Sequence, residues 1–575
     1  MQTIKMLFVT LSSVPARGRR RVEGFYVSSG PVEAGYNPGM ALRVHNLSLA
    51  PEDGEGSLSA QAARKLRIES GRITSLRVVR RGFDARLRHR RWIYTVCVTV
   101  SGDEGVVLSR LRDPDVRPEP AAAEPQVRPG AQPLEAPPLV IGAGPAGLFA
   151  ALLLAEQGYR PLVLDRGRPV EARTADVAAL ATHGRLDEES NLLFGEGGAG
   201  TYSDGKLYSR THDSLAGWVA GRLVEFGADA QIAVEARPHV GSDRLGQVCV
   251  AMRARIEALG GHVRFACRVD DLELVDGRLV LVRTSRGESL AVGVAILAPG
   301  HSARDTFAML LRRGVALEAR PFQMGVRIEH PQTLIDRGQL GELAARADLT
   351  PADYRLVARG AAATGAIRAD VYSFCMCPGG RVLPAFHQGG TVCTNGGSNR
   401  RRDSGWANAG LVMTVAPRNF GPDPLAGIAL QERIERACFA AAGGDYRIPA
   451  QRAVDFLAAR PSSGAIESSS LTGACPGELN ALLPDFLTGA LARALPMFEE
   501  QVPGFAGPEA VLLAPETRAS CPVRIVRHAL TRASVSADNL YPAGEGAGYA
   551  GGIVSSAVDG LHAAEAVIAK YRPPR

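Results

Sequence analysis

A glycine-rich hexapeptide gives this chain its clearest chemical signature. Gly142, Gly144 and Gly147 follow the short apolar run Leu139–Ile141. The first glycine permits a tight turn, the second lets the backbone approach a pyrophosphate, and the third lets a helix pack closely on the strand. Unpaired N–H groups at the start of that helix attract phosphate oxygens. The segment therefore predicts a dinucleotide-binding βαβ unit.

An acidic residue at the end of the second strand narrows the choice of nucleotide. Asp165 follows the apolar run Arg160–Leu164 and stands about 20 residues after the first glycine, where an acid accepts hydrogen bonds from ribose hydroxyls. A carboxylate at this position repels the 2′-phosphate of NADP. The sequence around Asp165 therefore favours FAD or NAD and does not separate them.

Later glycine turns favour FAD over NAD. One turn ends at Gly300 after an apolar strand, and Gly544–Ile553 leads into a helix up to Lys570. Gly195–Thr201 is a further glycine-rich segment, whose backbone can lie against a cofactor. The sequence has no second complete βαβ unit with a GxGxxG turn, so we expect no dedicated nicotinamide domain, and NAD(P)H stays open as a transient reductant.

Together these motifs resemble the family of uncharacterised FAD-dependent dehydrogenases, in the glutathione-reductase-like superfamily of FAD proteins. The resemblance implies non-covalent FAD and hydride transfer between flavin N5 and an organic substrate of unknown identity. The matching segments keep the family's order along the chain: Phe194–Leu207, Gly325–Pro331, Tyr372–Gly380, Thr394–Leu411, Pro515–Ile525 and Gly544–Ile553.

From the glycine-rich hexapeptide and the family resemblance we predict a set of cofactor-binding residues. These residues come from several distant segments. They are Gly142, Gly144, Pro145, Ala146, Gly147, Asp165, Arg166, Gly197, Gly198, Gly200, Thr201, Ser203, Asp204, Lys206, Val269, Ala298, Gly300, Gly544, Glu545, Gly552 and Ile553.

Three charged residues are candidates for catalysis: Lys206, Arg327 and Glu329. A cation near the flavin's N1–C2 carbonyl stabilises the anionic reduced flavin, and Lys206 is the candidate for it; a surface salt bridge is the alternative. Arg327 and Glu329 alternate along an apparent strand, so both face the same side. They either line the catalytic cavity or pair with each other.

Cysteines and histidines offer weaker signals. Cys375 and Cys377, with Cys393 as a third thiol, form a Cys-X-Cys pattern that is a poor zinc spacing without a second pair, so we predict no metal site. A flavin–disulfide relay usually uses a longer spacing. We therefore expect ordinary free thiols, with redox activity as the alternative. The histidines that could act as general acids are His301, His330 and His387.

The pattern of segments predicts an α/β protein with a split Rossmann-like FAD-binding domain, an inserted mixed α+β substrate domain and a small N-terminal α/β domain. Residues 1–39 read as an extension, disordered or untranslated, with Met40 as an alternative start. The expected ranges are 40–112 for the small basic domain, 113–137 for a Pro/Ala-rich linker, 138–310 and 530–575 for the FAD-binding domain, and 311–529 for the insertion.

Charge and composition set the remaining expectations. Residues 1–125 hold 20 Lys and Arg against 13 Asp and Glu, which accounts for the whole net charge of +7. An Arg-rich stretch at 77–91 raises the alternative of a nucleic-acid-associated flavoprotein, and a non-catalytic FAD-binding protein is a third hypothesis. Nine cysteines and the lack of a long apolar run predict a cytoplasmic protein without a membrane span. The oligomeric state stays open.

Overall fold

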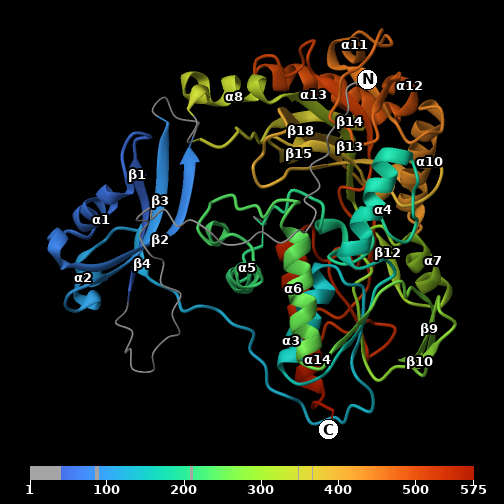
Figure 1. Cartoon of the computed structure of the whole chain (residues 1–575), viewed down its shortest axis with the longest axis horizontal. Coiled ribbons are helices and arrows are strands. Elements are labelled where there is room, and N and C mark those ends of the chain that lie inside the picture. The colour runs from blue at the N-terminus through green and yellow to red at the C-terminus, as the bar shows by residue number, and fades with distance from the viewer. Residues whose placement is uncertain (1–40, 85–89, 208–210, 347–348, 365–366, 575) are drawn as a thin grey trace, which may run out of the picture.

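The computed structural model describes residues 41–84, 90–207, 211–346, 349–364 and 367–574, so the expected extension 1–39 lies outside the described residues. Three domains are visible in Figure 1: a small N-terminal domain in blue, a central domain that holds both green and red segments, and an inserted domain in yellow and orange. In the described part of the chain, no helix has both the length and the apolar character needed to cross a bilayer.

The N-terminal domain is a four-stranded antiparallel sheet in the order β2-β3-β1-β4 with two helices, which is the ferredoxin-like arrangement. The strand Val116–Pro118 pairs with the first strand of this sheet, and Val116 is buried. The sheet thus extends into the range 113–137 that was predicted as linker. Its elements are β1 Leu42–Leu49, α1 Leu58–Leu66, β2 Ile73–Asp84, β3 Arg91–Val100, α2 Glu104–Arg110 and β4 Val116–Pro118.

The central domain is built on a five-stranded parallel sheet in the order β23-β11-β5-β6-β7, so its edge strand comes from the C-terminal part of the chain. A three-stranded antiparallel sheet, β10-β9-β8, is attached to it. The elements are β5 Leu139–Ile141, α3 Pro145–Glu156, β6 Leu162–Leu164, α4 Val170–His183, α5 Leu215–Glu225, α6 Leu245–Ala258, β7 His262–Arg264, β8 Val269–Val275, β9 Arg278–Thr284, β10 Ser289–Ala291, β11 Ala295–Leu297, α7 Arg304–Arg312, β23 Leu540–Pro542 and α14 Ile553–Lys570.

The inserted domain contains a seven-stranded sheet in the order β14-β15-β18-β13-β21-β19-β20. Strands β12 and β22 pair with each other where the chain enters and leaves the insertion. The elements are β12 Leu317–Ala319, β13 Phe322–Pro331, α8 Gln332–Leu340, β14 Val357–Thr364, β15 Ile367–Cys377, β16 Arg381–Pro384, β17 Thr394–Gly397, β18 Trp406–Val415, α9 Pro417–Phe420, α10 Ala426–Ala441, β19 Ile448–Arg452, α11 Ala453–Leu457, β20 Ala474–Pro476, α12 Leu479–Leu482, α13 Asp485–Glu499, β21 Val511–Glu516 and β22 Val523–Ile525.

The chain between the first two domains lies along the end of helix α14. Gly130 N donates to the carbonyl of Ile568 at 2.8 Å, and Gln132 forms a parallel bridge with Tyr571. Figure 1 shows this connection running under the central domain toward the C-terminus. The extended composition of the segment suits this course, because it needs no core of its own.

Helices α3 and α14 lie against each other in the middle of the central domain. Residues Ala146–Ala155 of α3 are all buried, as expected for a helix that is apolar on every side. A Cβ placed on Gly560 of α14 would lie 2.1 Å from the carbonyl oxygen of Ala146, so the two backbones meet where Gly560 has no side chain. This approach fixes the start of one helix beside the start of the other.

The backbone contact at Gly560 predicts a stability defect when a methyl group is added there. We expect Gly560→Ala to lower the free energy of unfolding by about 1–3 kcal/mol, because the new Cβ overpacks the helix pair. Gly217→Ala is the matched control, since Gly217 also lies in a helix but has nothing within 4 Å of its Cβ position. Urea unfolding followed by circular dichroism measures both. Equal stabilities of the two variants would contradict the packing argument.

Candidate functional site

The main cavity of the protein lies where helices α3 and α14 begin and has a volume of about 240 Å³. Gly144 and Pro145 line it at the start of α3, and Gly552 and Ile553 line it at the start of α14. Both helices therefore direct their unpaired N–H groups and the positive ends of their dipoles toward the same space. Such a space favours a ligand with two separate anionic or electron-rich groups.

Close backbone contacts shape the floor of this cavity. Gly142 has a φ of +103°, and a Cβ there would lie 2.2 Å from the carbonyl oxygen of Ala298. Gly198 has a φ of +61°, and its Cβ position is 3.1 Å from the Cα of Gly144. The two glycine turns predicted from sequence thus meet each other across the floor. Only a residue without a side chain fits either position without strain.

Asp165 closes the loop that follows β5. Its Oδ2 accepts a hydrogen bond from the amide of Ala143 at 2.7 Å, and its Oδ1 accepts one from the amide of Gly167 at 2.8 Å. The carboxylate is buried and lines the cavity. Each oxygen has a second lone pair, so Asp165 can hold the loop and still accept from ribose hydroxyls.

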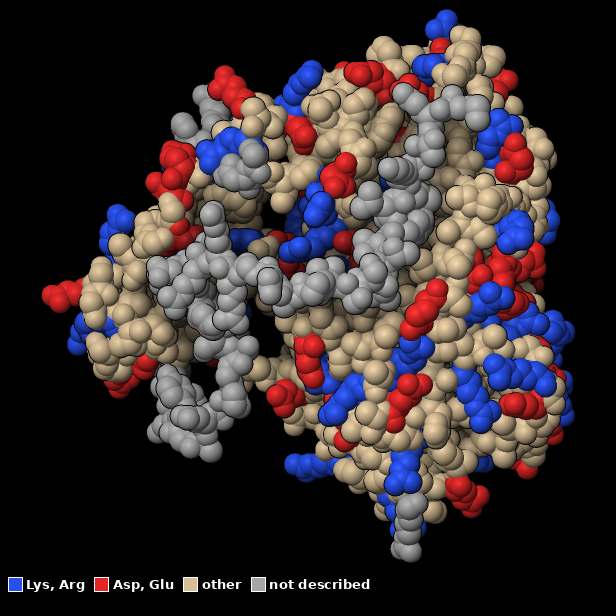
Figure 2. All heavy atoms as spheres, in the orientation of Figure 1, with Lys and Arg blue, Asp and Glu red and all other residues tan. Residues whose placement is uncertain are grey.

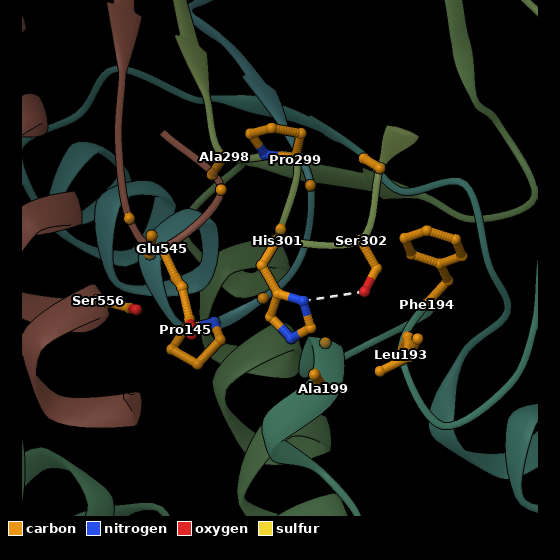
Figure 3. A pocket seen from close by; sticks show the side chains of 18 of the residues that line it. Pro145, Leu193, Phe194, Ala199, Ala298, Pro299, His301, Ser302, Glu545 and Ser556 are labelled. Atoms are coloured by element: carbon orange, nitrogen blue, oxygen red, sulfur yellow. Dashed lines mark hydrogen bonds between the residues drawn. The ribbon is translucent and has the colours of Figure 1, made fainter. Parts of the chain in front are cut away.

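Two titratable side chains, Glu545 and His301, line the cavity, and Figure 3 shows both in its wall together with Pro145. Burial raises the pKa of Glu545 to about 7, although Arg320 opposes the shift. Burial, together with Arg518 and Arg304, lowers the pKa of His301 to about 4, so its imidazole is neutral near pH 7. His301 Nδ1 lies 2.9 Å from Ser302 Oγ.

A buried ion cluster connects the cavity wall to the inserted domain. Arg518 lines the cavity, and its Nε and Nη2 donate to Glu435 at 2.9 and 2.6 Å. Arg304 of α7 donates to the same carboxylate twice, at 2.9 Å each. Burial alone would raise the pKa of Glu435, but the two guanidinium groups hold it at about 2. Two cations thus share one carboxylate beside the cavity. Arg518 also donates from Nη1 to His387 Nδ1 at 2.8 Å.

Comparison with protein-family models identifies both halves of this site. A Rossmann-like NAD(P)-binding domain matches residues 140–193, and the C-terminal domain of FAD-dependent proteins matches residues 321–519. An uncharacterized protein of Clostridium beijerinckii is 39% identical over 539 residues, which cover 93% of this chain and 100% of that protein. The chain belongs to a family of FAD-dependent proteins. Residues 41–100 match a domain model of unknown function.

Other proteins are similar to parts of this chain. Protein FixC of Salmonella typhi is 28% identical over 221 residues, which cover 35% of this chain and 45% of FixC. Glycine oxidase from Bacillus cereus has a TM-score of 0.31 at 10% identity and covers 76% of this chain and 98% of its own. Quinol fumarate reductase from E. coli has a TM-score of 0.34 at 12% identity, covering 76% of this chain and 70% of its own.

Most of the residues predicted to bind FAD lie in the wall of the main cavity. The lining residues among them are Gly142, Gly144, Pro145, Ala146, Asp165, Arg166, Gly198, Gly200, Ser203, Val269, Ala298, Gly300, Gly544, Glu545, Gly552 and Ile553. No Cβ at Gly300 or Gly552 would meet another described atom within 4 Å, so the wall is open there. The glycine floor, the two helix starts and the open wall fit FAD.

The other predicted FAD-binding residues lie behind this wall. The carbonyl oxygen of Gly142 is 1.8 Å from the Cβ position of Gly147, so Gly147 serves the contact between helix and loop. Gly197 and Thr201 line a small apolar pocket next to the main cavity. Asp204 is buried and pairs with Lys206. FAD contact by these residues stays a prediction.

The three predicted catalytic residues do not line the main cavity. Lys206 pairs with Asp204, and its Nζ lies 3.3 Å from Cys377 Sγ. Arg327 donates from Nε and Nη2 to Glu516 at 2.6 Å each, rather than pairing with Glu329. Arg327 contacts two residues of the cavity wall, since its Nη2 lies 3.4 Å from Asn395 Oδ1 and its Nη1 lies 3.5 Å from the carbonyl oxygen of Cys375.

Glu329 belongs to a different set of contacts. Its carboxylate accepts from the amide of Ser469 at 3.0 Å and from the hydroxyl of the same residue. His330, a candidate general acid, is buried with its Nε2 2.8 Å from the carbonyl oxygen of Phe505. The expected alternative, a pair between Arg327 and Glu329, is therefore wrong, because each has other partners. A catalytic role for Glu329 stays a prediction.

Sequence reasoning missed several residues of the cavity wall. Phe374 and Asn395 come from the inserted domain, and Phe194 and Arg268 from loops of the central domain. None of them follows from the spacing of the fingerprint, because the fold brings them in from remote strands. Cys375, predicted as an ordinary free thiol with redox activity as the alternative, also lines the cavity.

The Arg-rich stretch of the N-terminal domain is partly neutralised. Arg77 lies 3.5 Å from Glu119, and Arg81 lies within 3.6–3.9 Å of Glu55 and Glu235. Arg86 and Arg88 lie outside the described residues. Figure 2 shows basic and acidic side chains interspersed over the visible face. Within the described ranges, no group of three His, Cys, Asp or Glu residues could hold a metal ion.

The pKa of Glu545 predicts a pH-dependent stability of the flavin-free protein. A carboxyl whose pKa rises from 4.5 to about 7 on folding destabilises the fold as the pH increases across that interval. We expect Glu545→Gln to flatten the decline of unfolding free energy between these pH values. The exposed Glu500 supplies the control Glu500→Gln. Urea unfolding at a series of pH values measures the slopes, and an unchanged slope for Glu545→Gln would show the inference to be wrong.

The buried pair of Arg327 and Glu516 predicts a large loss of stability when one partner is neutralised. Glu516→Gln leaves the guanidinium of Arg327 buried without its countercharge, so we expect a loss of about 3–5 kcal/mol. Glu509 is exposed, and Glu509→Gln is the matched control. Denaturant unfolding of the purified proteins provides the comparison. A loss for Glu516→Gln no larger than that of the control would rule out this estimate.

Proposed function

We propose that this flavoprotein transfers hydride between an organic substrate and bound FAD, with the flavin ring between the start of α14 and the inserted domain. The observation that carries the proposal is the convergence of two helix N-termini on one glycine-floored cavity. One N-terminus suits the pyrophosphate and the other suits the electron-rich edge of the flavin. FAD supplies a ring that accepts two electrons and a proton as hydride.

The side chains around the cavity would position the reactants and control charge. Arg518 places a buried positive charge in the wall, which favours an anionic reduced flavin or an anionic substrate. Arg518 thus takes over the electrostatic role that the sequence suggested for Lys206. Phe374 reaches the cavity from the inserted domain and would help to exclude water from the reacting atoms.

His301 and Glu545 differ in what they can do with a proton. The neutral imidazole of His301 can donate or accept a hydrogen bond without carrying charge. Glu545, with a pKa of about 7, can accept or release a proton near neutral pH. We infer that Glu545 holds polar groups of the cofactor.

The proposal leaves open the identities of the electron donor and of the substrate. NAD(P)H would dock transiently and reduce the flavin, and the substrate would be a small organic molecule that fits between Arg518 and Phe374. Salt bridges to Glu55, Glu119 and Glu235 reduce the basic character of the N-terminal surface. No observation in the described residues favours nucleic acid over a small molecule.

Gly198 provides the sharpest test of the cofactor site. Gly198→Val places a branched side chain on a residue with positive φ directly against Gly144, so we expect at least tenfold weaker FAD binding. The measurement is the flavin absorption band of the purified protein and reconstitution with added FAD. Gly221→Ala, on an open position of helix α5, serves as control.

The same preparation tests the redox activity. Anaerobic mixing with NADH, NADPH and a panel of organic reductants should bleach the flavin band with at least one of them. A colourless wild-type protein that cannot be reconstituted with FAD would overturn the proposed function.

A further inference from the structure

Two cysteines meet the wall of the flavin cavity at the end of strand β15. Cys375 lines the cavity, whereas Cys377 is fully buried behind it. The thiol of Cys377 is directed back toward Cys375, because its Sγ lies 3.2 Å from the carbonyl oxygen of that residue. All nine cysteines are reduced in this structure.

The backbone between the two cysteines departs from a regular strand. Phe374 pairs with Gly410 and Cys377 pairs with Asn408, so one extra residue is inserted on β15. Cys375 itself has a φ of +46°. Two residues of a straight strand span about 7 Å, near the upper limit for the Cα atoms of a disulfide, and a bulge shortens this span. Positive φ at a residue other than glycine is uncommon and concentrates at functional sites.

Buried cations surround the pair. Lys206 Nζ lies 3.3 Å from Cys377 Sγ, and Arg327 Nη1 lies 3.5 Å from the carbonyl oxygen of Cys375. Burial raises the pKa of Cys377 to about 11, while Lys206 and Arg327 act in the opposite direction. The thiol therefore keeps its hydrogen at rest, and the ammonium group stands ready to stabilise a thiolate during exchange.

We propose that Cys375 and Cys377 form a second two-electron redox centre that exchanges electrons with FAD. This proposal rests on the proposed function, since FAD is its redox partner. It also gives Lys206 a task as a positioning residue that stabilises the sulfur of Cys377. The short Cys-X-Cys spacing, which argues against a relay in a regular strand, becomes suitable through the bulge.

The exchange balances without another reactant. When the dithiol is oxidised, two S–H bonds break, one S–S bond forms, and two electrons and two protons pass to FAD, which becomes FADH2. In the reverse direction FADH2 returns to FAD, the S–S bond breaks and both thiols re-form. Cys375 is the sulfur exposed to the cavity, and Cys377 completes the disulfide from behind.

Anaerobic reductive titration of the FAD-loaded protein tests the proposal. After mild oxidation with diamide, the wild type should consume twice the reductant that its FAD content requires. Cys375→Ser and Cys377→Ser should keep the flavin spectrum and consume only the amount that FAD requires. Cys475→Ser, which removes a buried thiol at strand β20, should behave like the wild type.

Mass spectrometry gives a readout that does not depend on the flavin. Oxidised wild type, with or without FAD, should yield a peptide with Cys375 and Cys377 joined and two hydrogens lighter, and the bond should be absent from either serine variant. The dithiol centre would be overturned if the yellow wild type consumed only the reductant that its flavin requires. The thiols of Cys375 and Cys377 would then both still react with a labelling reagent after oxidation. A colourless protein would instead count against the proposed function.

Lys206→Gln separates a positioning role from a purely structural one. Loss of the ammonium group raises the pKa of the Cys377 thiol. We therefore expect chemical labelling of this thiol in the reduced protein to require a higher pH than in the wild type. The Cys375–Cys377 bond should still form at a slower rate. A labelling profile identical to the wild type would show that Lys206 does not act on this sulfur.

Discussion

The contact between the backbones of helices α3 and α14 is the constraint on which the site depends. Gly560 touches the carbonyl of Ala146, and Gly147 touches the carbonyl of Gly142. Because no side chain separates these backbones, the two helices begin at the same cavity although about 400 residues lie between them in the chain. A larger interhelical distance would move one positive helix end away from the cavity, and a single ligand could no longer span both.

A second constraint holds the inserted domain over that cavity. Arg304 belongs to α7 of the central domain, whereas Glu435 belongs to α10 of the insertion and Arg518 follows β21. Their buried hydrogen bonds form one network across the domain boundary. Such a network is costly when one member is missing, since a buried charge then lacks a partner. The cluster therefore favours one arrangement of the two domains, and it keeps Arg518 in the cavity wall.

The sequence predicted the parts of the site that depend on local rules. The strand, turn and helix around Gly142 are set by neighbouring residues, so helix α3 begins at Pro145 and the strands fall where their apolar runs lie. After the insertion, the chain returns to the parallel sheet of the central domain with β23. Lys206 shows the limit of this reasoning. Its position shortly after the segment Gly195–Thr201 suggested a contact with the flavin. Instead, its ammonium group lies beside Cys377, which is 171 residues away in the sequence.

The residues of the cavity wall come from two domains, which explains why the GxGxxG motif at Gly142–Gly147 predicts the cofactor but not the reaction. The glycine turns and helix starts of the central domain supply backbone groups, which can hold FAD in the same way whatever the substrate. Phe374, Cys375, Asn395 and Arg518 come from the insertion and add their side chains to those of Phe194, His301 and Glu545 in the cavity wall. These residues lie on separate strands and loops, so no spacing in the sequence connects them. Variation in the insertion can therefore change the side chains of the cavity wall while the βαβ unit stays as it is.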